Sequence, residues 1–373
     1  MVTTGTVAPL FRPFVLNGLR LPNRIVMAPM TRWGSPNGIP GGDVAAYYRR
    51  RAENDCGLII TEGTTVDHPV ASYSVRVPVF HGEALSGWRR VVAEVHAAGG
   101  RIMPQLWHVG IARRPSQDYP NRHLPSVSPS GLFLPDKEPV APPATRAELR
   151  AVSAAFVKAA CQARELGFDG IELHGAHGYL FDQFFWQPIN RRDDEYGGDL
   201  EGRTRFAVET IGAIRRAVGA DYPFIFRISQ WKEQDYTAKL ARSPDELAGF
   251  LGILARAGID AFHCSQRRYW EAEFPGSALN LAGWAKRLTQ KASIAVGSVG
   301  LSGELNTRGP GGLGQHAAVA GIDGLLERME RDEFDLIAVG RALLADPAWA
   351  RKVREGRFDE LTPYTPAALE RLH

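Results

Sequence analysis

The chain contains 373 residues, of which 44% are hydrophobic and 23% charged, values typical of a folded globular protein. No apolar stretch approaches the roughly 20 residues that a membrane-spanning helix requires, and the first residues lack the apolar region of a secretory signal peptide. Lysine and arginine total 44 against 41 for aspartate and glutamate, and this small excess is scattered along the chain. We therefore expect a cytoplasmic protein that binds neither membranes nor nucleic acids.

Two local features have ordinary interpretations. The three arginines at residues 49–51 form the densest basic run, and we expect them to lie on a solvated helix face. Cys56, Cys161 and Cys264 are far apart, so they predict neither a disulfide framework nor a zinc or iron–sulfur site. A reducing cytoplasm fits this pattern best.

Eight short apolar runs of strand length occur along the chain. Most are continuous in Ile, Val, Leu and Phe rather than alternating with polar residues, which is typical of parallel strands buried on both faces. The runs cover residues 25–28, 57–61, 101–106, 168–173, 223–228, 259–264, 292–296 and 334–339.

Segments with helical periodicity separate these runs. Thr145 and Glu148 form a capping box before one of them, and Ser243 followed by Pro244 starts another. Eight strands alternating with helices predict an α/β fold, the (β/α)8 or TIM barrel, and an open doubly wound sheet is the alternative. The predicted helices cover residues 43–54, 84–98, 147–166, 201–218, 244–257, 281–290 and 322–331.

We expect one domain over residues 1–373, because no linker or second core interrupts the alternation. Asn17-Gly18 is the turn of a predicted hairpin that is placed to close the bottom of the barrel. Long intervals after the third and fourth strands predict inserted loops. The parts are the hairpin at 14–21, the barrel core at 22–356, a capping insertion at 109–146, a second insertion at 185–200 and a C-terminal tail at 357–373.

Active sites of such barrels lie at the carboxyl ends of the strands, and the last two strands are followed by a phosphate-binding pattern. Gly297, Gly300 and Gly340 allow close approach of the backbone, and Arg341 supplies a bidentate charge. The alternative is a pair of ordinary tight turns. A separate G-x-G-x-x-G match at residues 309–314 does not directly follow its strand, so we interpret it as a loop rather than a dinucleotide site.

Four polar residues at other strand ends are candidates for chemistry. Arg227 interrupts an apolar strand, so it either pairs with Glu172 in the core or faces a ligand. His174 and His177, followed by Tyr179, can hold one carbonyl oxygen beside a phenol that acts as an acid. The alternatives are half of a metal site, completed by a third ligand, and histidines that only pack.

Five blocks of sequence resemble the old yellow enzyme family of flavin-dependent ene-reductases. They occur in order over nearly the whole chain, and each falls at or near the end of a predicted strand. The blocks are residues 23–32 (NRIVMAPMTR), 100–108 (GRIMPQLWH), 170–184 (GIELHGAHGYLFDQF), 190–198 (NRRDDEYGG) and 335–347 (DLIAVGRALLADP).

The resemblance implies one FMN per barrel, no metal, and NAD(P)H as the hydride donor. It implies that an α,β-unsaturated carbonyl or nitroalkene then accepts hydride at Cβ, while Tyr179 protonates Cα and His174 and His177 bind the substrate oxygen. Trp33, Tyr73 and Trp107 are candidate pocket walls, with plain packing as the alternative, and a homo-oligomer is possible on family habit. The implied FMN-binding residues are Ala28, Pro29, Met30, Thr31, Gly63, Gln105, Arg227, Ser298, Gly300, Gly340 and Arg341.

Two other functions remain as alternatives. One is a metal-dependent barrel hydrolase that uses His174 and His177. The other is a barrel that binds FMN or a phosphorylated ligand without turnover. No role is assigned to residues 229–241, 266–276 and 301–321, and the sequence distinguishes neither NADH from NADPH nor the physiological substrate.

Overall fold

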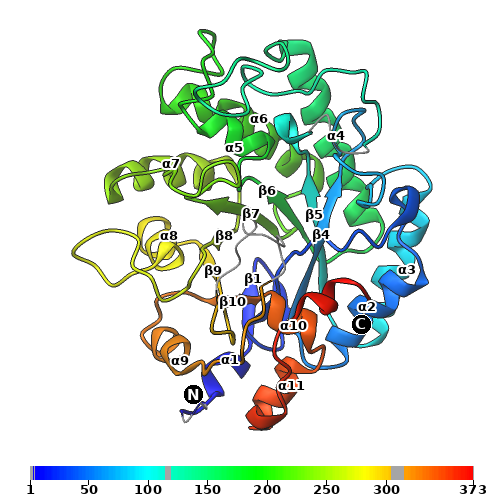
Figure 1. Ribbon diagram of the computed structural model, residues 1–373, viewed down its shortest axis with the longest axis vertical. Helices are drawn as coiled ribbons and strands as arrows, with labels where there is room; N and C mark the ends of the chain where they lie inside the picture. The colour runs from blue at the N-terminus through cyan, green and yellow to red at the C-terminus, as the bar shows by residue number, and fades with distance from the viewer. Residues whose placement is uncertain (1–2, 4, 114–118, 304–314, 373) are drawn as a thin grey trace.

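The computed structural model describes residues 3, 5–113, 119–303 and 315–372, and its centre is a closed barrel of parallel strands. Figure 1 shows the strands at the middle of the molecule with helices around them. Closure between the last and first strands excludes the open sheet. The barrel strands, in chain order, are β3 (Ile25–Met27), β4 (Leu58–Thr65), β5 (Ile102–Trp107), β6 (Ile171–His174), β7 (Phe224–Ser229), β8 (Ala261–Ser265), β9 (Ala292–Val296) and β10 (Leu336–Val339).

Each of the eight predicted strands is confirmed, and so are the seven predicted helices. The capping box of Thr145 and Glu148 is formed, and the Ser243 side chain caps its helix as expected. The predicted helices are α2 (Gly42–Ala52), α3 (Ala84–Ala97), α4 (Arg146–Glu165), α6 (Leu200–Val218), α7 (Pro244–Ala257), α8 (Leu281–Thr289) and α9 (Asp323–Glu330).

Several short elements were not predicted, because they are too brief to show helical periodicity. None of the helices in the described ranges is long and apolar enough to cross a membrane. The additional elements are α1 (Ala8–Phe11), α5 (Leu180–Phe185), α10 (Arg341–Ala345), α11 (Trp349–Arg354) and the 3₁₀ turns η1 (Pro36–Gly38), η2 (Gly110–Ala112), η3 (Phe358–Glu360) and η4 (Pro366–Leu369).

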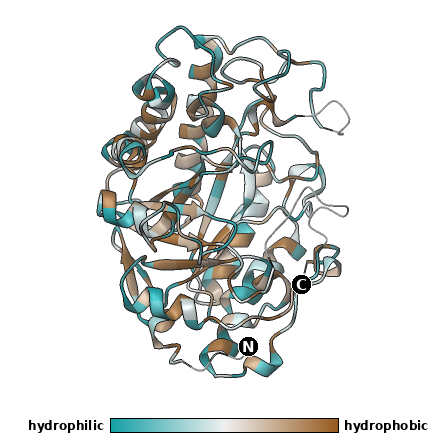
Figure 2. Ribbon diagram, turned by 60° about the vertical axis from the view of Figure 1, so that its left-hand side comes forward, coloured by the Kyte–Doolittle hydropathy of each residue, from teal (hydrophilic) through white to brown (hydrophobic). Residues whose placement is uncertain are grey.

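The N-terminal hairpin is confirmed and supports the barrel interior. Its strands, β1 (Phe14–Leu16) and β2 (Leu19–Leu21), pair antiparallel around Asn17 and Gly18, which both have positive φ. Leu16 and Leu21 pack into the same buried cluster as inward-facing residues of the barrel strands. Figure 2 shows that the barrel strands are hydrophobic along most of their length, as strands buried on both faces must be.

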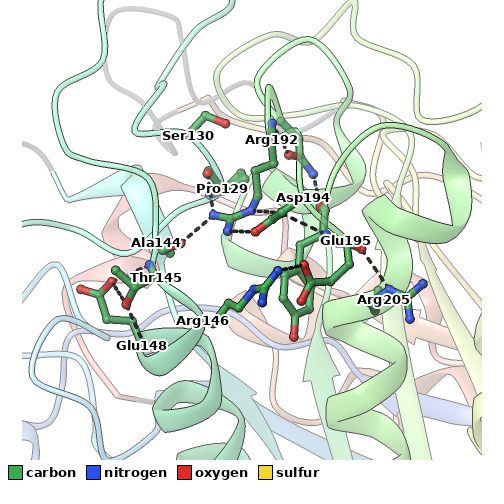
Figure 3. Close-up of polar contacts among 12 residues, drawn as sticks. Pro129, Ser130, Ala144, Thr145, Arg146, Glu148, Arg192, Asp194, Glu195 and Arg205 are labelled. Atoms are coloured by element: carbon green, nitrogen blue, oxygen red, sulfur yellow. Dashed lines mark hydrogen bonds and ion pairs between the residues drawn. The ribbon is translucent and has the colours of Figure 1, made fainter.

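The insertions after the third and fourth barrel strands are also confirmed, and they are tied to each other. Arg192 donates hydrogen bonds to the carbonyl oxygens of Pro129 and Ala144, at 3.1 and 2.6 Å, while Asp194 holds its guanidinium (Figure 3). One charged side chain from the second insertion therefore satisfies two backbone carbonyls of the first. The G-x-G-x-x-G match at residues 309–314 lies outside the described residues.

Arg51 corrects the expectation that the basic run is a solvated face. Its side chain is fully buried, and it donates hydrogen bonds to the carbonyl oxygens of Tyr47, Leu343 and Leu344. Leu343 and Leu344 lie in the last turn of α10, where carbonyl groups lack helical partners. Arg51 thus caps a helix contributed by the opposite end of the chain.

Replacing Arg51 by Met should lower the free energy of unfolding by about 2–4 kcal/mol, because buried carbonyls lose a charged donor. The matched control is Arg49→Met, whose side chain is partly exposed and pairs with Glu53 and Glu94. That substitution should lower the free energy of unfolding by less than about 1 kcal/mol. Urea denaturation of both variants measures the difference, and equal losses would contradict the capping role.

Glu62 anchors the segment after β3 to the middle of β4. It is buried, its Oε2 accepts the backbone N–H of Arg32 at 2.7 Å, and its own N–H donates to the Tyr48 hydroxyl. Its Oε1 has no hydrogen-bond partner among the described residues. Burial raises the pKa of Glu62 to about 7, because desolvation outweighs the hydrogen bond from Arg32.

This shift predicts a pH-dependent stability. The folded protein keeps the Glu62 proton up to about pH 7, whereas the unfolded chain releases it near pH 4.5, so unfolding releases a proton between these values. The free energy of unfolding should therefore fall by about 3 kcal/mol over that window as pH rises. In Glu62→Gln, the free energy of unfolding should lose this pH dependence. In the control Glu165→Gln, which replaces an exposed carboxyl group, the pH dependence should remain. Denaturation of both variants at pH 5 and pH 8 measures the difference.

Candidate active site

A cavity of about 1090 Å³ opens at the carboxyl ends of the barrel strands, where the sequence analysis expected the site. The residues predicted for catalysis and the predicted pocket walls all line it. Gly300 is the exception among the predicted cofactor residues, because the space beside its Cα faces Trp349. The predicted residues that line the cavity are Ala28, Pro29, Met30, Thr31, Trp33, Gly63, Tyr73, Gln105, Trp107, His174, His177, Tyr179, Arg227, Ser298, Gly340 and Arg341.

Both predicted histidines are neutral in this setting. Burial comes first among the causes that hold the pKa of His174 and of His177 well below the ordinary value, and the charge of Arg227 lowers both further. The ring of His174 stacks on Trp107, with ring centres 5.7 Å apart, and His177 lies 5.1 Å from His174. Two uncharged imidazoles therefore meet in one wall, each with a single N–H to donate.

Hydrogen bonds assign the proton of each ring. The backbone N–H of Ala176 contacts Nδ1 of His174 at 3.3 Å, which leaves the proton of this ring on Nε2. Nε2 of His177 contacts the Ser265 hydroxyl at 2.7 Å, and Ser265 accepts from Arg227 at the long distance of 3.5 Å. Ser265 can donate its hydroxyl proton to Nε2, and in that arrangement the proton of His177 lies on Nδ1.

Tyr179 lies against this pair and has a carboxylate behind it. Its ring meets those of Trp107 and His174 edge to face, with centres 4.7 and 5.0 Å apart. Its hydroxyl donates a hydrogen bond to Oε2 of Glu233 at 3.1 Å. The phenol is therefore fixed in direction by two aromatic neighbours and one polar contact.

Below the cavity, Glu172 joins three strands of the barrel. Its carboxylate accepts from the Gln105 amide at 2.7 Å and contacts Nδ1 of His263 at 2.7 Å. Glu172 and Arg227 form no ion pair within 4.0 Å, so Arg227 is not neutralised by direct contact with the residue suggested from sequence. His263 is therefore a hydrogen-bonding partner in this network.

Three non-glycine residues of the cavity wall have left-handed backbone conformations. The φ angles of Trp33, His177 and Ser298 are 50°, 63° and 54°. Such conformations cost of order 1 kcal/mol each and persist only where the surroundings impose them. In His177, this backbone conformation is held by a hydrogen bond from its N–H to Ser229 Oγ at 2.8 Å.

The loop after β7 was assigned no role from sequence, and it forms a large part of the wall. Lys232 in this loop pairs with Asp182 of α5 at 2.5 Å, and both side chains are completely buried. Asp182 also accepts the N–H of Gly178, and Gln234 donates to the Gly178 carbonyl. No local pattern revealed this loop, because its partners lie about 50 residues earlier in the chain.

Other unassigned segments also contribute to the cavity. Gln266 and Arg267 line it from the loop after β8, and Tyr364 and Leu369 line it from the C-terminal tail. The Arg32 guanidinium holds this tail by donating to backbone carbonyls in and just beyond η4. The tail thus packs on its own chain.

The residues present fit an FMN-like ligand. Arg227 is buried, and its Nε has no hydrogen-bond partner among the described residues, so the wall offers a cation to a ligand that becomes anionic. Gly63 also lines the cavity, and its lack of a Cβ lets Trp107 pack against it, since that atom would lie 2.5 Å from the Trp107 ring. Among the described residues, no three His, Cys, Asp or Glu side chains are grouped as a metal site requires, which disfavours the hydrolase alternative.

Comparison with known proteins identifies the family. The sequence profile of the NADH:flavin oxidoreductase / NADH oxidase family matches residues 9–360. The chain is 42% identical to 12-oxophytodienoate reductase 7 of Oryza sativa over 227 residues, a match that spans 57% of this chain and only 57% of the rice protein. It is 32% identical to the NADPH dehydrogenase of Bacillus velezensis, over 92% of this chain and 93% of that protein.

A solved structure agrees with these matches. The Old Yellow Enzyme from Pichia sp. AKU4542 superposes with a TM-score of 0.77 and 25% identity, over 97% of this chain and 90% of that chain. Profile, relatives and structure point the same way as the five sequence blocks. The chain therefore belongs to the NADH:flavin oxidoreductase / NADH oxidase family, the old yellow enzyme family of barrels that carry FMN and take hydride from NAD(P)H.

Proposed function

We propose that the protein is an ene-reductase that reduces the activated C=C bond of α,β-unsaturated carbonyl or nitro compounds at the expense of NAD(P)H. The observation that carries this proposal is the convergence of two neutral imidazoles and one oriented phenol in a single wall of the cavity. A relative named as a 12-oxophytodienoate reductase supports the substrate class.

We assign the predicted cofactor residues to two groups. FMN, when bound, is the carrier that passes two electrons from NAD(P)H to the alkene. Thr31, Gln105 and Arg227 hold its ring by hydrogen bonds and charge, while Ser298 and Arg341 hold its phosphate. The backbone of residues 28–30, with Gly63 and Gly340, gives the ring close approach to the wall.

His174 and His177 bind the oxygen of the electron-withdrawing group. The proton on His174 Nε2 and the proton on His177 Nδ1 are the donors, since each ring's other nitrogen is engaged by the protein. Two fixed donors stabilise negative charge as it develops on that oxygen, without reorganisation at the moment of reaction. Because both rings are neutral, they polarise the substrate without transferring a proton.

Tyr179 is the acid that protonates Cα. Its hydroxyl is the polar end of a side chain otherwise packed against Trp107 and His174. Packing of this kind excludes water and fixes the direction of proton transfer.

We extend the proposal to the whole molecule as one FMN-binding domain, with residues 109–146 as its capping insertion. Ala112 and Phe133 of that insertion line the cavity. We also propose a cytoplasmic location, because Cys56, Cys161 and Cys264 are all free thiols.

The visible spectrum of the purified protein, before and after anaerobic addition of NADPH or NADH, tests the proposed function. Two flavin bands that bleach on addition, and return when 2-cyclohexen-1-one is added, are the expected result. A colourless protein that fails to take up added FMN would overturn the proposal. A yellow protein that neither nucleotide bleaches would favour the binding barrel without turnover.

Tyr179→Phe should separate the two half-reactions. Bleaching by NADPH should stay within about twofold of wild type, because that step needs no proton from Tyr179. Reoxidation by 2-cyclohexen-1-one should slow by about 100-fold or more, the usual contribution of a positioned acid. Stopped-flow absorbance measures both rates.

The matched control is Tyr196→Phe, which removes a phenol that also donates to a glutamate, Glu209, but does not line the cavity. It should leave both half-reactions unchanged. If Tyr179→Phe behaves like this control, Tyr179 is not the acid.

A further inference from the structure

Trp231, in the loop between β7 and α7, lies against one of the two imidazoles of the cavity wall. Its ring centre is 4.5 Å from that of His177, and the two ring planes are 30° apart, so the rings meet in a tilted stack. Trp231 is half-buried and lines the cavity. No sequence block of the family resemblance includes this tryptophan, so its place beside the imidazole needs an explanation from the geometry.

Two serines at the ends of neighbouring strands each bind both Trp231 and His177. Ser229, the last residue of β7, accepts the N–H of His177 at 2.8 Å and donates to the carbonyl of Trp231 at 2.7 Å. Ser265 ends β8; its hydroxyl contacts Nε2 of His177 at 2.7 Å, and its carbonyl accepts the indole N–H at 3.2 Å. The backbones of the two residues are thus joined at one strand end and their rings at the next, so the barrel sets how the rings lie.

Further contacts hold the indole from the other parts of the wall. The ring centre of Tyr236 lies 5.3 Å from that of Trp231, and the Arg267 guanidinium lies 4.3 Å from the centre of the Tyr236 ring. Lys232, the next residue after Trp231, is anchored by its buried ion pair with Asp182. The indole therefore has little freedom to move, and it restricts the imidazole that packs on it.

His177 needs such a restriction because its own backbone conformation is unfavourable. Its φ angle of 63° is left-handed, and its ring meets that of His174 only edge to face, with centres 5.1 Å apart. A hydrogen-bond donor stabilises a developing negative charge best when it is fixed before that charge appears. Rotation of the imidazole would turn its N–H away from the charge, and contact with the indole face opposes that rotation.

We propose that Trp231 is a positioning residue, which fixes the plane of the His177 imidazole and thereby sets how strongly the site binds the oxygen of the electron-withdrawing group. Trp231 acts through His177 and takes no part in hydride or proton transfer. The inference rests on the proposed ene-reduction, in which His177 binds that oxygen. The role requires a flat apolar face rather than the indole N–H, which the Ser265 carbonyl already accepts.

The test compares the holoenzymes of wild type, Trp231→Met and Trp231→Phe, with 2-cyclohexen-1-one as the probe. Methionine fills much of the indole volume without a planar face, whereas phenylalanine keeps such a face. In Trp231→Met, the limiting rate of reoxidation after reduction by NADPH should fall by about 10-fold, less than the roughly 100-fold that loss of a donor costs. In Trp231→Phe, that rate should stay within about twofold of wild type.

Binding of the probe provides a second readout that does not depend on activity. The Kd of 2-cyclohexen-1-one for the oxidised holoenzyme, measured by calorimetry without NADPH, should rise by about threefold in Trp231→Met, as expected when one hydrogen bond is weakened. Trp231→Phe should keep the wild-type Kd. FMN content and the midpoint of urea denaturation check that each variant folds, and Trp231→Leu, a second variant without a planar face, should repeat the Trp231→Met result.

Two comparisons separate positioning from plain packing. In a His177→Ala background, Trp231→Met should have no additional effect on the limiting rate, because the two side chains act as one unit. The matched control is Trp270→Met, which removes an exposed tryptophan from the loop after β8. Trp270 does not line the cavity, so this variant should match wild type in both rate and Kd.

The outcomes distinguish this inference from the proposed function. If Trp231→Met keeps the wild-type Kd and limiting rate, the positioning role is overturned and the ene-reductase stands. The same conclusion follows if Trp231→Met slows the reaction equally with and without His177, or if Trp231→Phe is as slow as Trp231→Met. If wild type bleaches with NADPH but no enone or nitroalkene reoxidises it faster than buffer does, the proposed function fails and this inference with it.

Discussion

The buried ion pair between Lys232 and Asp182 is the constraint on which the cavity wall depends. Neither side chain reaches solvent, so each charge is tolerated only because the other lies 2.5 Å away. Burial raises the pKa of Asp182 and the charge of Lys232 opposes it, which is the balance expected when two desolvated groups hold one another. The pair joins the loop after β7 to α5, and thus fixes two neighbouring βα units at their functional ends.

The consequences of this joint extend to the chain segment that carries His177 and Tyr179. Asp182 accepts the N–H of Gly178, and the carbonyl of His177 accepts the N–H of Glu233, so the chain between His177 and Tyr179 is held from both sides. His177 keeps its left-handed backbone within that frame. A mobile loop could not hold an imidazole in this conformation, because the strain would be released by a small movement. Lys232 is thus committed to a structural pair with Asp182.

The sequence predicted the barrel well because the signals of its strands and long helices are local. The boundaries of α7 and β9 agree with the predicted ranges to the residue, since a proline and a serine start the helix and an apolar run defines the strand. Helices of five or six residues, such as α5 and α10, are shorter than two helical turns and leave no periodic signal. Arg51 was misjudged for a different reason: a run of arginines says nothing about which of them meets carbonyls from the end of the chain.

The site shows the same contrast between residues with a local signal in the sequence and residues that depend on distant contacts. The residues at strand ends were located because barrel topology brings those ends together, and the family blocks supplied their order. Glu233 and Ser265 were not assigned roles, since each acts through a contact with a residue distant in sequence. Gly300 was included because glycine near a phosphate pattern suggests close backbone approach, whereas here its open side accommodates Trp349. Spacing identifies which loops surround a site, and only packing decides which atoms face it.

In the proposed function, the charges of the cavity wall assign electron transfer and proton transfer to different groups. Among the described residues, Arg227 retains a buried positive charge without a direct carboxylate partner, because Glu172 is engaged by Gln105 and His263. That charge, with desolvation, keeps His174 and His177 neutral. A protonated imidazole at either position would compete with Tyr179 as an acid and would repel Arg227. In the proposed reaction, neutral histidines therefore leave proton donation to the phenol and leave the buried cation to stabilise negative charge, so the two tasks do not interfere.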